Sequence, residues 1–118
     1  MIGANVPIYV ALEPVDMRKS FDTLAFVVRD QLGLNPESGA LFVFSGKRST
    51  RLKILWFHKN GYCLLSKRLH RAVFRMPKAM EPSAPLVEVD LLELGKILDG
   101  IALSAKKREI RTAASFAA

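Results

Sequence analysis

The side chains best suited to chemistry in this sequence are the lysines and arginines of its middle third. The chain has 118 residues, with 18 basic and 11 acidic side chains and a net charge of +7. No Asp or Glu stands between Ser38 and Met80. That window holds ten of the bases, namely Lys47, Arg48, Arg51, Lys53, Lys59, Lys67, Arg68, Arg71, Arg75 and Lys78. A block of one sign is typical of a surface that binds a polyanion, although a solvated positive face that only maintains solubility is the alternative.

The same window lacks the groups that most enzymes need. Without a carboxylate it provides neither a pair for acid–base catalysis nor the ligands of a two-metal nuclease. Glu13, Asp16 and Asp22 form a set of acids close to one another, and they fit the start of a helix, where they complement the helix dipole. We therefore expect no enzyme activity, no cofactor and no small-molecule substrate.

The single cysteine limits disulfides and metal sites alike. One Cys forms no disulfide within the chain, and we expect a reducing, cytoplasmic location. His58, Cys63 and His70 do not make a zinc site, because a fourth ligand is missing and the predicted hairpin puts His70 on the other face. Apolar runs are short, and the start of the chain has no positive segment before a long apolar one, so we expect no membrane span and no signal peptide.

The elements that must position the bases are predicted to form one α+β domain over residues 1–103, followed by a basic, flexible tail over residues 104–118. Apolar residues at helical spacing predict a helix over residues 17–32, which Asp16 caps and Gly33 ends. Asp90 with Glu93 predicts the start of a short helix that Gly100 ends. Strands are predicted at residues 8–12, 40–45, 51–58 and 62–69, with shorter ones at 72–76 and 87–89. We expect a mostly antiparallel sheet around a central hairpin, with the main helix packed on one face and a short C-terminal helix.

Asn60-Gly61 predicts the two-residue loop of that hairpin. Lys59 then faces Tyr62, Lys53 faces Arg68 and Arg51 faces His70. Neighbouring like charges cost stability, and an anion from a partner would explain why they are tolerated; the alternative is that the long side chains spread apart into water.

The two faces of the hairpin differ in composition. The face with Trp56, Ile54 and Leu52 is the more apolar, and we expect it to face the core. Phe57 and Tyr62 lie near the turn on the other face, where they are candidates for stacking on nucleic-acid bases.

Three separated blocks of this sequence resemble one family in order and spacing. They are PVDMRKSFDTL at residues 14–24, LFVFSGKRSTRLKILWF at 41–57 and GYCLLSKRLHRAVFRMP at 61–77, and LDGI at 98–101 completes the pattern. They are similar to TnpB, the small accessory protein encoded by insertion sequences of the sixty-six family. The matching residues are Asp16, Met17, Arg18, Lys19, Phe42, Phe44, Arg48, Lys53, Leu55, Gly61, Lys67, Arg68, Leu69, Phe74 and Pro77.

Some positions depart from the family's pattern. His58, Lys59 and His70 stand where acids are frequent, which makes this chain more basic. Ala72 replaces a frequent Gly, and Met76 replaces a frequent Trp.

The resemblance implies a non-catalytic protein that assists transposition beside a transposase. We predict two kinds of partner: DNA, either transposon ends or any sequence, and the transposase and other proteins of the same element. We expect no membrane contact. If about five phosphates are neutralised, affinity falls roughly 500-fold between 50 and 200 mM salt. The alternatives are a module that docks the transposase without touching DNA, and an RNA-binding protein that stacks bases on Phe57 and Tyr62. The predicted DNA-binding residues are Arg18, Lys19, Lys47, Arg48, Arg51, Lys53, Lys67, Arg68, Arg71 and Arg75.

Overall fold

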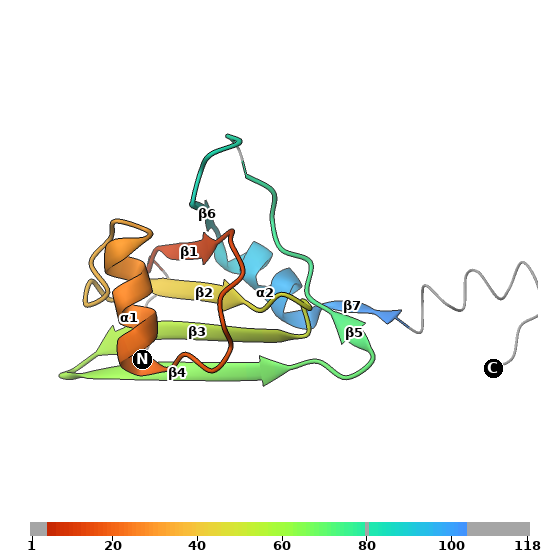
Figure 1. Ribbon diagram of the computed structural model, residues 1–118, viewed down its shortest axis with the longest axis horizontal. Helices are drawn as coiled ribbons and strands as arrows, with labels where there is room; N and C mark the ends of the chain where they lie inside the picture. Colours follow the sequence, from red (N-terminus) through yellow and green to blue (C-terminus); the bar gives the residue numbers. More distant parts are fainter. Residues whose placement is uncertain (1–4, 80, 104–118) are drawn as a thin grey trace, which may run out of the picture.

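The computed structural model of the chain describes residues 5–79 and 81–103 (Figure 1). The predicted tail over residues 104–118 lies outside the described residues. The elements in chain order are β1 (Ile8–Ala11), α1 (Phe21–Asp30), β2 (Leu41–Ser45), β3 (Arg51–His58), β4 (Gly61–Arg68), β5 (Ala72–Val73), β6 (Leu86–Val89), α2 (Leu91–Asp99) and β7 (Ile101–Ala102).

Five of the strands form one sheet in the order β4-β3-β2-β1-β6. Only β1 and β2 run parallel; the other neighbours are antiparallel, which confirms the α+β class and the mostly antiparallel sheet. The β3–β4 hairpin is not central as predicted, because β4 forms an edge of the sheet. The centre belongs to β2, whose five residues are all buried. An apolar strand of this kind is stable only with cover on both faces.

Both faces of the sheet are covered, one by α1 and the other by α2 (Figure 1). On the α1 face, Phe42, Phe44 and Leu55 are buried in one cluster with residues of α1. On the α2 face, Leu52 and Ile54 are buried in a second cluster with residues of α2. The expectation that the face of Leu52 and Ile54 looks to a core is therefore confirmed, and the opposite face has a core of its own. Side chains of β2 alternate between the faces, so each face needs its own cluster.

The predicted start of the first helix was also wrong. The cap of α1 is Ser20, not Asp16, and the helix begins at Phe21. The N–H of Ser20 donates to Thr23 Oγ1 at 2.8 Å. Asp16 instead accepts the backbone N–H of Arg18 at 2.9 Å, which closes a turn before the helix. Asp and Ser are equally good cap types, so local preference did not decide between them.

The hairpin has a different loop from the one predicted. Lys59 and Asn60 occupy the turn with φ of 42° and 70°, and His58 pairs with Gly61. A tight turn of this type needs positive φ at both central residues, and here Lys59 and Asn60 supply it. The pairing is therefore shifted by two residues, which leaves every side chain on its predicted face but sets Arg51 opposite Arg68.

The last elements follow the prediction more closely. Asp90 accepts the N–H of Glu93 at 2.8 Å at the start of α2, and Gly100 ends the helix with a φ of 71°. The predicted strand after the hairpin is reduced to β5, which pairs with β7 in a separate two-stranded sheet.

Candidate nucleic-acid interface

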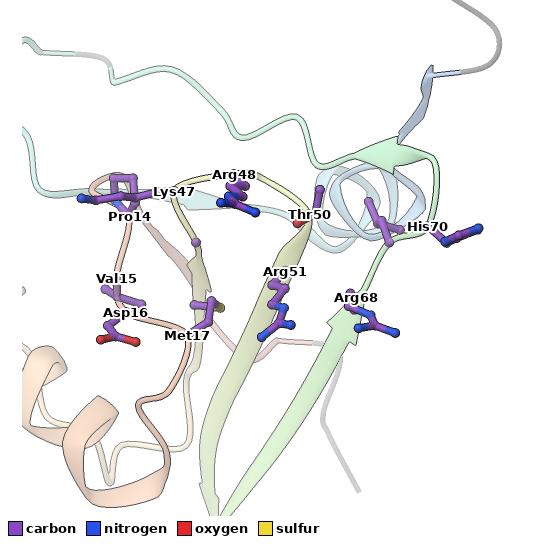
Figure 2. A pocket seen from close by; sticks show the side chains of 12 residues that line it. Pro14, Val15, Asp16, Met17, Lys47, Arg48, Thr50, Arg51, Arg68 and His70 are labelled. Carbon is purple, nitrogen blue, oxygen red and sulfur yellow. The ribbon is translucent and has the colours of Figure 1, made fainter.

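An open hollow lies at the end of the hairpin where β3 begins and β4 ends (Figure 2). Its cavity volume is about 810 Å³. Three stretches of the chain contribute to it: the segment before α1, the β2–β3 turn, and the end of β4. The lining residues are Pro14, Val15, Asp16, Met17, Gly46, Lys47, Arg48, Thr50, Arg51, Arg68, Leu69 and His70.

Backbone hydrogen bonds hold the three stretches together. The N–H of Val15 donates to the carbonyl of Ser45 at 2.9 Å, which joins the 14–17 segment to the end of β2. The N–H of Leu69 donates to the carbonyl of Thr50 at 2.8 Å, which joins the end of β4 to the turn. Main-chain hydrogen bonds therefore hold the walls of the hollow together, and the backbone that carries its charged side chains is fixed in place.

Gly46 allows the 14–17 segment to approach the turn. A Cβ placed at Gly46 would lie 2.7 Å from Cγ of Met17, closer than real Cβ atoms come to a neighbour. Any larger residue at position 46 would displace the Met17 side chain and with it one wall of the hollow.

Four cations line the hollow. Lys47, Arg48, Arg51 and Arg68 are all exposed. Arg51 and Arg68 are direct partners across β3 and β4, a register that puts Cβ atoms about 5 Å apart. Within the described part of the chain, none of the four has a carboxylate oxygen within 4.0 Å. Figure 2 shows Arg48, Arg51 and Arg68 on one side of the hollow, across from Asp16. Their charge is therefore uncompensated and available to an anion.

Asp16 is the acidic residue of the lining, and its charge is already paired. The Arg18 guanidinium donates to both carboxylate oxygens, and its shortest contact is 2.6 Å. These hydrogen bonds, with the one from the Arg18 N–H, hold the pKa of Asp16 well below its usual range. Arg18 is 91% exposed, but its charge is balanced by Asp16, so it adds little to the net charge of the hollow.

Two predicted phosphate ligands have structural partners instead. Lys53 is half-buried, and its Nζ donates to the carbonyl of Lys19, which ties β3 to the segment before α1. Lys67 lies on the α2 face, where its Nζ donates to the carbonyl of Leu98 at 2.8 Å. Neither Lys53, Lys67 nor Lys19 lines the hollow.

The remaining predicted residues also lie outside the lining. Arg71 and Arg75 are exposed in and after the connection to β5. Phe57 and Tyr62 pack against each other edge to face, with ring centroids 5.1 Å apart, at the turn end of the hairpin. Tyr62 also packs against the α1 cluster, and burial, with the Glu37 carboxylate adding to it, raises the pKa of its hydroxyl. These two rings already have packing partners.

Sequence reasoning located the cationic wall but missed the wall opposite. Pro14 and Val15, which belong to that wall, had no chemical signal of their own. The signal that was present is the family-like VDMRK block, which stands about 30 residues before the basic turn. Only the fold shows that the two blocks meet.

The described residues also bear on metal binding and membrane insertion. Among residues 5–79 and 81–103, no group of three His, Cys, Asp or Glu side chains is placed to hold a metal ion. In the same residues, no helix has the length and apolar character needed to cross a membrane.

Comparisons with known proteins agree with the blocks noted in the sequence. A family model described as IS66 Orf2 like protein (TnpB_IS66) matches residues 6–108. The chain is 38% identical over 99 residues to the uncharacterized protein y4hO of Sinorhizobium fredii, covering 84% of each chain. It is 35% identical over 79 residues to the uncharacterized protein y4jC of the same organism, covering 65% of this chain and 68% of that one. No solved structure matches.

Proposed function

This chain belongs to the IS66 Orf2-like family, and we propose that it is a non-catalytic accessory protein for transposition of an insertion sequence that binds DNA through the hollow. The family supports the link to transposition. The contact with DNA is our inference from the charges, and it applies to element ends and to other sequences alike, because phosphate contacts carry no sequence information.

The observation that carries the proposal is the group of four exposed, unpaired cations around one hollow. The Arg51–Arg68 pair costs stability in the free protein, since like charges directly opposite each other repel. A phosphate between them would remove that cost and gain charge-assisted hydrogen bonds. With four phosphates neutralised in place of five, affinity falls roughly 150-fold between 50 and 200 mM salt.

The test compares two triple variants that remove the same charge. The first variant replaces Arg48, Arg51 and Arg68 with Ala and so removes the guanidinium groups that line the hollow. Arg29→Ala, Lys78→Ala and Lys96→Ala remove three exposed cations from elsewhere.

Both variants are titrated by gel shift against the ends of the element and against random DNA, at two salt concentrations. We expect the hollow variant to bind all sequences at least about 100-fold more weakly near 100 mM salt, and the control to change by less than about 5-fold. Equal losses of DNA affinity in the two variants would show that only net charge matters and would reject the hollow as the DNA-binding site.

A second candidate is docking of the transposase without DNA contact. Phe26 of α1 is 63% exposed and Phe21 is 44% exposed, and exposed aromatic side chains are frequent in protein interfaces. A pull-down with purified transposase in the presence of nuclease separates the two functions. An association that DNA bridges is lost, whereas direct docking remains and is weakened by Phe26→Ser.

A further inference from the structure

We propose that the hollow takes an unpaired nucleotide of a DNA strand, and not the outside of a double helix. This inference rests on the DNA-binding role proposed above and specifies the form of DNA. Its first support is shape. A cavity volume of about 810 Å³ falls in the range of about 300 to 1,000 Å³ that encloses small organic molecules. A duplex keeps its bases stacked inside and presents only phosphates at the rim, whereas an unpaired nucleotide has a base free to enter.

The second support is the difference between the two walls. Arg48, Arg51 and Arg68 make one wall cationic, and Val15 and Met17 make the other largely apolar (Figure 2). A nucleotide has the same asymmetry, with an anionic phosphate at one end and a flat base at the other. Bases stack by their flat faces on apolar side chains, so the wall of Val15 and Met17 can hold the base while the phosphate meets the arginines.

Asp16 determines the orientation in which a nucleotide would lie in the hollow. Asp16 stands with the apolar wall, and the ion pair with Arg18 keeps it ionised and balances its charge. Its carboxylate oxygens can still accept hydrogen bonds from the amino groups of a base, which the unpaired arginines opposite cannot do. The base therefore belongs on the wall of Asp16 and the phosphate on the wall of the arginines.

The basic residues around the hollow favour a strand over a free nucleotide. Lys47 lies at one side of the hollow and His70 at the other (Figure 2), and Arg71 directly follows His70. Lys47 and Arg71 are both exposed, so the phosphates before and after a bound nucleotide have cations to meet.

The test is a set of binding titrations with the full chain near 100 mM salt, in which fluorescence anisotropy reports binding. The probes are a labelled single strand of about 15 nucleotides, the same sequence as a duplex, and a strand of equal length without bases. We expect the single strand to bind about 10-fold more tightly than the duplex or the strand without bases, because one stacked base contributes on the order of that factor.

A matched pair of variants tests the direction of the site. Asp16→Asn removes the acid of the hollow, and Asp30→Asn removes an exposed acid at the end of α1. We expect Asp16→Asn to bring the preference for bases over no bases below about 3-fold, because the base loses hydrogen bonds to a charged acceptor while the strand without bases loses nothing. Asp30→Asn should keep the full preference. An unchanged preference in Asp16→Asn would overturn the orientation.

The outcomes separate this inference from the proposed function. Equal or tighter binding of the duplex overturns the inference and leaves DNA binding in place, while no binding of any probe overturns both. Displacement of the strand by a free mononucleotide at equal concentration, or tighter binding of the same sequence as RNA, overturns the assignment to a DNA strand.

Discussion

The two ends of the β3–β4 hairpin lie on one face of one sheet and differ in what covers them. At the turn end, Phe57 and Tyr62 pack on each other and Tyr62 reaches the α1 cluster. At the open end, Arg51 and Arg68 face each other beside the irregular 14–17 segment. The difference arises because α1 begins only at Phe21. Where the helix covers the sheet the side chains build a core, and where it does not they leave a charged hollow.

The largest expected effect is on the covered region. Phe42 is fully buried in the α1 cluster. Phe42→Ala should lower the free energy of unfolding by about 3 to 5 kcal/mol through lost burial and the cavity left behind. Urea denaturation measures it. Phe26→Ala, on the exposed side of α1, serves as control and should change stability by less than about 0.5 kcal/mol. A small loss in Phe42→Ala would mean that this face is no true core.

At the open end, substitution should lower DNA affinity and raise stability, the opposite of the loss of stability expected in the covered region. Arg51→Ala with Arg68→Ala should weaken DNA binding roughly 60-fold near 100 mM salt, since two phosphate contacts are lost. The same double variant should gain a few tenths of a kcal/mol in stability, because the like-charge pair is removed. Titration and urea denaturation of one sample give both values. A double variant that loses stability would contradict the idea that the pair is kept for a partner.

Gly46 offers a test of how the open end is shaped. Gly46→Ala should cost about 1 to 3 kcal/mol, because the added methyl meets Cγ of Met17 and the wall must shift. Gly95→Ala is the matched control in α2, where nothing lies within 4 Å of the new methyl and alanine favours the helix. That change should stabilise the protein by about 0.5 to 1 kcal/mol. Thermal melts compare the two, and equal melting temperatures would reject the close approach at Gly46.

The smallest effects separate structural lysines from binding ones. Lys53→Met removes the hydrogen bond to the Lys19 carbonyl, and we expect a stability loss of about 1 kcal/mol with less than about 3-fold change in DNA affinity. Lys67→Met, which removes the bond to the Leu98 carbonyl on the opposite face, is the comparison. A large fall in affinity for Lys53→Met, at unchanged stability, would return that residue to the binding site.

The features that were predicted correctly depend on residues close together in the sequence. The strands and the Asp90 cap follow from short patterns that no distant contact overrides. The start of α1 was wrong because Asp16 and Ser20 are equally good cap residues. The hairpin loop was wrong for another reason: Gly61 has the stronger local preference for positive φ, yet Lys59 and Asn60 occupy the turn.

Only part of the lining of the candidate site could be predicted, for a related reason. A run of cations is visible in the sequence, but their orientation is not. Arg48 and Arg51 line the hollow, whereas Lys53 turns to a backbone carbonyl. The apolar wall was not predictable, because the Val15–Ser45 hydrogen bond that places it joins residues 30 positions apart.

The slope of log affinity against log salt concentration tests the central claim most directly. Four cations on phosphate predict a slope of about −3.6 for the unaltered protein on a duplex probe and about −2.8 on a single strand. Once Arg48, Arg51 and Arg68 are alanine, the slopes should fall to about −0.9 and −0.7. One slope shared by both proteins would show that the hollow does not meet phosphate.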